Sequence, residues 1–313
     1  MMNSRRSAGA TSFLLALIMA KSVTLSAAAD GKNAALSDQR VRDAVVLRHD
    51  DVTESSGLAA SHRQPGLFWT HNDSGSQSKL FAFDRTGRNS GACRLKLAAA
   101  IDWEDMASFV QAGQARLIVA DCGDNRAKRD SISLYVFDEP DPQRSTDVDS
   151  YHELIVTYPD GACDCEAIAV DPRRRQIVLI AKRILGGAPL YVVPLPDERL
   201  LRETTIRRQR TNSKLTATRI GTLPVAVVSA MDIDAETGDI WVVNYLTAYR
   251  YRCRSRDQRL QEQLAQSSES IPLPRWKQIE AVAVDQDRQI WITCEGKPAM
   301  LGRLNTTAEP SAP

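Results

Sequence analysis

Acidic and amide side chains gather in three short segments of the sequence, at residues 71–73, 102–105 and 121–125. Carboxylate and amide oxygens are the ligands that Ca²⁺ takes, about six to eight at a time. Carboxylates held close together repel one another, and a bound cation offsets that cost. The sequence therefore predicts a Ca²⁺ site, and its candidate ligands are Asp73, Asp102, Glu104, Asp121, Asp124 and Asn125.

No single loop matches the consecutive ligand pattern of an EF-hand, so this site would be assembled from several loops. The same side-chain types also accept backbone hydrogen bonds in ordinary turns, and the sequence leaves that alternative open. Other polar and basic residues are candidates for binding an anion or another ligand: His71, Asn72, Arg126, Lys182, Arg183, Glu166 and Glu280. Arg and Lys beside a metal can hold a phosphate or carboxylate ester. Catalytic residues are not assigned, because neither a Gly-x-Ser-x-Gly elbow nor a phosphate-binding glycine loop is present.

The elements that would position these side chains form a repeat. An acidic or polar residue followed by small and apolar residues recurs in five copies, which begin at Glu54, Asp102, Asp164, Ser229 and Gln278. Successive copies are roughly 50 to 60 residues apart, which fits a four-stranded propeller blade with loop insertions. Each copy precedes short apolar, β-branched and aromatic runs that have the length and composition of strands.

The repeat predicts an all-β, single-domain β-propeller with five blades. The expected fourth strands of the blades are 93–97, 153–157, 215–220 and 270–273. The last copy has no fourth strand after it, whereas the strand-like segment 44–48 stands unused before the first copy. Pairing segment 44–48 with the last blade would close the ring and remove both open edges. Six blades are the alternative if the basic stretch 200–214 forms a degenerate blade, and a β-sandwich is a second alternative.

In a propeller, the loops before the innermost strands and those after the second strands lie on the same face. That rule brings the carboxylates to one mouth of the central channel. The acidic residues come mainly from blades one and two, and Lys182 and Arg183 come from blade three. The mouth is therefore expected to be acidic on one side and basic on the other.

The bulk composition adds limits on partners and location. Forty Lys and Arg against 39 Asp and Glu give a net charge of +1, so no bulk field favours nucleic acid or a membrane surface. Residues 1–29 have a basic start, a short apolar core and small residues before Asp30, which predicts a Sec-type signal peptide rather than a twin-arginine one. Export to the periplasm or outside the cell follows, without membrane insertion after cleavage. The remaining divisions are a linker at 30–43, the propeller at 44–304 and a tail at 305–313.

The six cysteines all follow the expected signal peptide. An even count in an exported chain favours structural disulfides, with free buried thiols as the alternative. Their spacing does not match a zinc or redox motif.

Part of the chain is similar to a known group of proteins. The motifs are residues 54–59, 69–75, 102–107 and 121–126, closed by Glu139-Pro140. Together they resemble an uncharacterised family of bacterial secreted propellers that is similar to phytase-like and NHL-type propellers. The phytase-like relatives imply calcium and phosphoester hydrolysis. Their catalytic acidic motifs do not match here residue by residue, and five blades would differ from their six.

Two functions are compatible with these observations. The first is a monomeric binding module that presents one face to a small molecule, glycan or protein, with a structural Ca²⁺ at the mouth. The second is a Ca²⁺-dependent, phytase-like phosphoester hydrolase. Neither involves nucleic acid.

Overall fold

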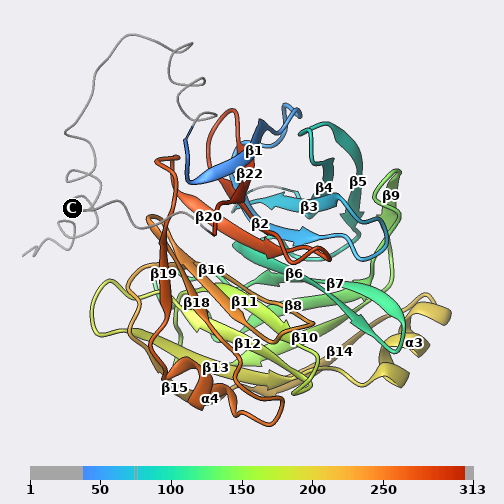
Figure 1. Ribbon diagram of the computed structural model, residues 1–313. Helices are drawn as coiled ribbons and strands as arrows, with labels where there is room; N and C mark the ends of the chain where they lie inside the picture. The colour runs from blue at the N-terminus through green and yellow to red at the C-terminus, as the bar shows by residue number, and fades with distance from the viewer. Residues whose placement is uncertain (1–37, 74, 76, 307–313) are drawn as a thin grey trace, which may run out of the picture. The chain divides into compact units, whose positions relative to one another are not determined.

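Five β-sheets surround a common axis in the computed structural model, which describes residues 38–73, 75 and 77–306 (Figure 1). Blade 1 contains β2 (Ser55–Ala60), β3 (Leu67–Asn72), β4 (Lys79–Asp84), β5 (Asn89–Leu95) and β9 (Ser145–Val148). Blade 2 contains β6 (Trp103–Gln111), β7 (Gln114–Asp121), β8 (Ile132–Asp138), β10 (Tyr151–Thr157) and β14 (Arg210–Thr216). The five-bladed propeller predicted from the repeat is confirmed.

The other three blades have four strands each. Blade 3 contains β11 (Cys165–Asp171), β12 (Gln176–Ala181), β13 (Ala188–Pro194) and β15 (Thr218–Leu223). Blade 4 contains β16 (Val228–Ile233), β17 (Ile240–Asn244), β18 (Thr247–Tyr251) and β19 (Glu269–Pro272). Blade 5 contains β20 (Ile279–Val284), β21 (Ile290–Cys294), β22 (Met300–Leu304) and β1 (Val41–Val46).

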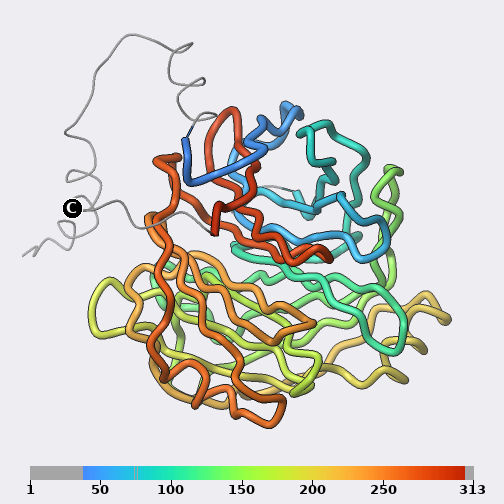
Figure 2. The backbone as a smooth tube through the Cα atoms, viewed as in Figure 1, coloured from blue at the N-terminus to red at the C-terminus, as the bar shows by residue number. Residues whose placement is uncertain are grey.

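The ring is closed by the first described strand. β1 pairs antiparallel with β22, and Val41 lies opposite Leu304 (Figure 2). The predicted closure is therefore confirmed, and β1 begins within the segment that the sequence suggested as a linker. Innermost strands of neighbouring blades also lie against one another in the order β2, β6, β11, β16, β20 and back to β2. The axis is thus lined by the five strands that begin the repeats.

The hydrophobic core is divided among the five seams between blades. One cluster of buried side chains fills each seam; Trp69 and Trp103, for example, meet between blades 1 and 2, and Phe68 and Trp291 between blades 1 and 5. Each blade therefore buries both faces. This explains why strands such as 176–181 are continuously apolar instead of alternating, as is typical of sheets covered on both sides.

The basic stretch that could have hidden a sixth blade forms other structure. Helix α3 (Glu198–Ile206) starts at Asp197, whose side chain accepts a hydrogen bond from the Arg199 backbone. β14 then adds to the outer edge of blade 2, parallel to β10. The expected fourth strand 215–220 was wrong in part, because the chain crosses from blade 2 to blade 3 at buried Ala217. A short helix, α4 (Leu260–Leu264), lies before β19.

Several sequence predictions fall on segments that the structure leaves out or shows differently. The expected signal peptide, residues 1–29, and residues 307–313 of the expected tail lie outside the described residues. Within the described part of the chain, no helix has the length and apolarity needed to span a membrane. All six cysteines are free thiols, so the disulfides favoured by the sequence are not formed in this structure. Five of the six are buried among apolar strand residues, which is the packing role of an unpaired cysteine.

Candidate metal centre at the channel mouth

The innermost strand of every blade has an irregularity at the same place. The strand register shifts after the first residue of β2, β6, β11, β16 and β20. One extra residue sits in each shift, outside the ladder, as in a β-bulge. The five bulged residues are Ser56, Glu104, Glu166, Ser229 and Glu280, and all are buried. The fold therefore presents five equivalent side chains at one mouth of the channel, and three of them are carboxylates.

The two serines join neighbouring blades. The Ser56 hydroxyl donates to the carbonyl oxygen of Glu104 at 2.9 Å, which links blade 1 to blade 2. The Ser229 hydroxyl donates to the carbonyl oxygen of Ile279 at 2.9 Å, which links blade 4 to blade 5. A glutamate at the same position has no proton to donate when ionised and reaches further. The bulge thus joins neighbouring blades through a serine in two blades and places a buried glutamate at the mouth in the other three.

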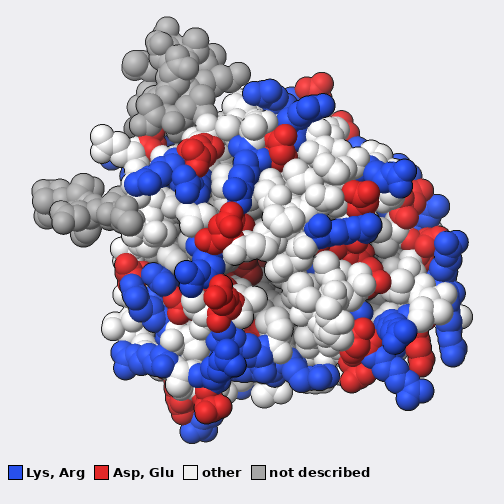
Figure 3. All heavy atoms as spheres, turned by 45° about the vertical axis from the view of Figure 1, so that its right-hand side comes forward, with Lys and Arg blue, Asp and Glu red and all other residues white. Residues whose placement is uncertain are grey.

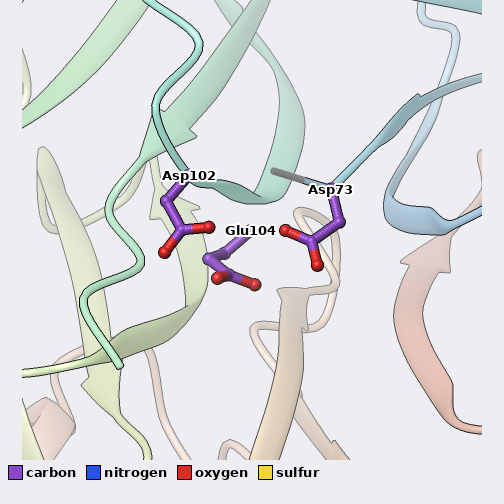
Figure 4. Close-up of side chains that lie close together, drawn as sticks. All are labelled: Asp73, Asp102 and Glu104. Carbon is purple, nitrogen blue, oxygen red and sulfur yellow. The ribbon is translucent and has the colours of Figure 1, made fainter. Parts of the chain in front are cut away.

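Two groups of three carboxylates converge at this mouth and share one member. Asp73, Asp102 and Glu104 form the first group, and their closest carboxylate oxygens all lie within 4.8 Å of one another. Glu104 also belongs to the second group, with Asp164 and Glu166, under the same limit. Figure 4 shows the carboxyl groups of the first group turned toward a common space. Four carboxylates from blades 1, 2 and 3 are therefore gathered around Glu104.

Glu104 is the least compensated of these groups. It is buried, with 6% of its surface exposed, and its carboxylate accepts no hydrogen bond from any residue that the structure describes. Burial raises its pKa well above the usual value, and the charges of Glu166, Asp73 and Asp102 raise it further. Burial likewise raises the pKa of Asp102 to about 6, aided by Asp73 and Asp164. A buried, unpaired carboxylate is costly, and a bound cation would remove that cost.

A lysine limits the negative charge on the blade 3 side. The ammonium nitrogen of Lys182, just after β12, lies 2.9 Å from Glu166 Oε1. Burial raises the pKa of Glu166 to about 7, although Lys182 counteracts part of the shift. The Lys182 pKa is raised because Glu166 and the Tyr245 phenol outweigh its burial. Lys182 also lies 5.8 Å from the centre of the Tyr245 ring, which belongs to the β17–β18 turn of blade 4.

Glu280, the third bulged glutamate, lies outside both groups. Its Oε1 accepts a hydrogen bond from the Gln278 side chain at 3.2 Å. Burial and the neighbouring Glu295 carboxyl raise the pKa of Glu280 to about 9. Lys277 pairs with Glu295 at 3.4 Å. The blade 5 glutamate therefore interacts with Gln278 and Glu295 of its own blade.

Gly123 is packed directly against the first group. A Cβ atom at this residue would lie 2.5 Å from Asp102 Oδ2 and 2.6 Å from Asp102 Cγ, and it would also overlap a Glu104 oxygen. The backbone of Gly123 is not in the left-handed region. The glycine is therefore required by the space that the carboxylates occupy.

Replacing Gly123 with Ala is expected to weaken cation binding about tenfold or more, because Asp102 and Glu104 must move and a misplaced ligand binds poorly. Circular dichroism should remain that of a folded propeller. Calorimetric titration with Ca²⁺ measures the effect. Asn125→Ala is the matched control, since Asn125 is exposed in the same loop. Equal affinities for the two variants would contradict this account.

The sequence-predicted residues Asp121 and Asp124 lie nearby but have other partners. Asp121 is fully buried and accepts hydrogen bonds from the backbones of Ile101 and Asp102, and Arg129 pairs with it at 2.8 Å. Asp124 Oδ2 accepts from the backbones of Lys128 and Arg129. Both carboxylates shape the loops that hold Asp102, and neither belongs to the two groups.

Other predicted residues also have local roles. Asn72 Oδ1 accepts hydrogen bonds from the backbones of Thr53 and Glu54, which ties the end of β3 to the segment that enters β2. His71 is fully buried against Trp103, and burial lowers its pKa to about 4, so it is neutral. Asn125, Arg126 and Arg183 are exposed.

Asp164 and Tyr245 were not among the candidates drawn from the sequence. The repeat places Asp164 at the channel mouth, because Asp164-x-Glu166 occupies the position of Asp102-x-Glu104, but Asp164 was not assigned as a ligand. Tyr245 lies in a tight turn and carries no sequence signal for its position near Lys182.

Comparisons with known proteins give distant structural likenesses that carry no argument about this chain. No family model matches the chain, and no curated protein matches it. One similar solved structure is a gluconolactonase from Xanthomonas campestris, which is 14% identical and aligns over 88% of this chain and 93% of that chain, with a TM-score of 0.44. No conclusion about the activity of this chain follows from so distant a likeness. The fold and site define a five-bladed β-propeller with a carboxylate-lined mouth that could hold a metal ion.

Proposed function

We propose that this protein binds a divalent cation at the mouth of its channel and uses the ion to hold a small anionic or oxygen-rich ligand. The observation that carries the proposal is Glu104, a buried carboxylate that belongs to both carboxylate groups and accepts no hydrogen bond from the described residues. Four further carboxylates surround it. Structural turn chemistry accounts for Asp121 and Asp124, but it gives no partner to Glu104.

Ca²⁺ is the proposed occupant. The two groups offer only carboxylate oxygens, without histidine or cysteine. Hard cations prefer such ligands, and Ca²⁺ accepts more of them, in less regular geometry, than Mg²⁺ does. The carboxylates come from five separate positions on three blades, which suits a site that tolerates irregular geometry.

Lys182 is the reason for expecting an anionic ligand. Its ammonium group is held beside the second carboxylate group by Glu166. A cation and an ammonium group side by side can bind a carboxylate or phosphate from two directions. Charges of both signs are mixed over the face shown in Figure 3, so recognition would depend on this local pair and not on a broad field. A binding module of this kind agrees with the export expected from residues 1–29.

Metal analysis of the purified, undialysed protein is the direct test, followed by thermal melting with EDTA and with added Ca²⁺, Mg²⁺ or Mn²⁺. We expect EDTA to lower the melting temperature and excess Ca²⁺ to restore it, since a ligand that binds only the folded state stabilises it. A melting temperature that changes with neither EDTA nor Ca²⁺ would exclude the metal site.

Lys182 also favours a second candidate, Ca²⁺-dependent phosphoester hydrolysis. In that reaction the cation would polarise the phosphoryl group, Lys182 would stabilise the negative charge and a mouth carboxylate would accept a proton from water. Turnover of p-nitrophenyl phosphate and phytate tests it. Activity should vanish in Lys182→Met and persist in Lys277→Met, whose ammonium group pairs with Glu295 instead. If the protein binds the cation but hydrolyses neither substrate, the hydrolase proposal is excluded and the binding-module proposal stands.

A further inference from the structure

Two thiols meet at the seam between blades 2 and 3. Cys122 follows β7, and Cys165 begins β11. The Cys122 thiol donates to the carbonyl oxygen of Cys165 at 3.0 Å. In the same place the Cys165 backbone N–H donates to the carbonyl oxygen of Cys122, at 3.4 Å. Both side chains are fully buried in the cluster that joins the two blades. The Cys165 thiol donates to the carbonyl oxygen of Ala167 at 3.8 Å. Burial raises the pKa of the Cys122 thiol, and the nearby Cys165 thiol raises it further.

The seam position also connects these thiols to the carboxylates. Cys122 directly precedes Gly123, which is packed against Asp102 and Glu104. Cys165 lies between Asp164 and Glu166 in the sequence. A covalent link between the two cysteines would therefore fix the backbone of blade 2 relative to that of blade 3, at the level where both carboxylate groups assemble.

The backbone geometry permits such a link. The backbone hydrogen bond from Cys165 N–H to the Cys122 carbonyl oxygen holds the two residues side by side, although they belong to different blades. Disulfides span Cα separations of about 4.4 to 6.8 Å, most often 5.5 to 6 Å. Cys163 is also in this cluster, but it lies on the same segment as Cys165 and has no backbone hydrogen bond to Cys122 in the described structure. Cys93 and Cys294 belong to the clusters of other seams.

We propose that oxidation converts Cys122 and Cys165, which are free thiols in this structure, into a disulfide that fixes the seam between blades 2 and 3 and stiffens the carboxylate site. The reaction joins the two sulfur atoms, and the two thiols lose two protons and two electrons. Glutathione disulfide or a dithiol–disulfide oxidoreductase accepts them and is reduced to thiols. Because both thiols are fully buried in the folded protein, the bond forms while the chain folds or when the seam opens.

The test starts from protein unfolded and reduced in guanidinium chloride. It is refolded in a mixture of oxidised and reduced glutathione, and free thiols are then alkylated under denaturing conditions for mass spectrometry. We expect four alkylated cysteines out of the six in the chain, with the mass of two hydrogen atoms lost. Peptide mapping should identify the Cys122–Cys165 bridge. Protein refolded with dithiothreitol should carry six alkyl groups and melt on the order of 5 °C lower.

Cys93→Ala is the matched control, because Cys93 is a buried thiol in blade 1. It should keep the bridge and its redox-dependent melting, whereas Cys122→Ala and Cys165→Ala should lose both. Six alkylated thiols after oxidative refolding, or a bridge between any other pair, would overturn the proposal.

The effect on the cation rests on the proposed function. The oxidised protein should bind Ca²⁺ several-fold more tightly than the reduced protein, because the carboxylates are better preorganised. If the bridge forms and neither form binds Ca²⁺, the metal proposal fails and the disulfide stands. If the oxidised and reduced forms bind Ca²⁺ equally, the disulfide does not affect the carboxylate site.

Discussion

The Glu104→Gln variant is expected to lose Ca²⁺ affinity by on the order of 100-fold or more. Changing a residue that only orients a metal ligand typically costs about 10- to 100-fold, and Glu104 is a member of both carboxylate groups. Glutamine keeps the size of the side chain and removes its charge. The measurement is isothermal titration of EDTA-stripped protein with Ca²⁺.

The same substitution should stabilise the metal-free protein. A buried carboxylate without a donor destabilises the fold, and a neutral amide does not carry that cost. Thermal melting in EDTA should therefore show Glu104→Gln at or above the wild-type melting temperature, with no further rise on adding Ca²⁺. Affinity and metal-free stability are thus expected to change in opposite directions.

Glu280→Gln is the matched control for this experiment. Glu280 occupies the equivalent bulge in blade 5 and is buried to a similar degree, but it belongs to neither carboxylate group. Its Ca²⁺ affinity should stay within about threefold of wild type, because burial and Glu295 raise the Glu280 pKa to about 9, so the carboxyl is mostly protonated and uncharged at neutral pH. Similar losses in both variants would mean that the whole mouth binds cations diffusely, without a defined site around Glu104.

The metal-free protein is expected to lose stability as the pH rises from about 4.5 to 7. Burial raises the pKa of Asp102 to about 6 and that of Glu166 to about 7. An acid whose pKa is higher in the folded state binds its proton more tightly there, so folding is favoured at low pH and this stability is lost as the pH rises through the raised pKa. Asp102 is partly exposed, and solvent screens its share of the effect. The loss should therefore be on the order of 2 kcal/mol, well below the sum of the two shifts, or several degrees in melting temperature.

Saturating Ca²⁺ should reverse this trend, because the ion binds the deprotonated carboxylates and protons compete with it. Stabilisation by Ca²⁺ should therefore be small near pH 5 and largest near pH 8. Melting curves in EDTA and in Ca²⁺ across this range provide the measurement. Asp102→Asn should flatten the EDTA curve, whereas Glu203→Gln, on the exposed side of α3, should not. A metal-free protein whose stability rises from pH 5 to 7 would contradict the assigned pKa shifts.

The sequence predicted the blades well because a blade is a local unit. Each one is built mainly from consecutive strands, so its composition and turns are visible in one stretch of chain. Even the closing strand could be inferred, since an unpaired segment remained at one end and a missing strand at the other. The strand 215–220 was misplaced in part because β14 and β15 are separated by Ala217 alone, yet they join different blades.

The site was predicted less completely, for a physical reason that Asp102 and Asp121 illustrate. Both are aspartates at the mouth-side ends of neighbouring strands. Asp121 is satisfied by two backbone donors and by Arg129, which folds back from the next loop. Asp102 instead faces Asp73 and Glu104. The sequence gives the residue type and the strand end, but it does not show which donors reach a carboxylate.

The sequence by itself determined the five repeats, the strands within them and the collection of acidic side chains at one mouth, because these follow from local pattern and repeated topology. Only the tertiary structure decided that a bulge recurs in every innermost strand. It also decided that Glu104 is buried among four other carboxylates without a donor from the described residues, and that Cys122 and Cys165 meet. These facts depend on contacts between blades, and such contacts join residues that lie far apart along the chain.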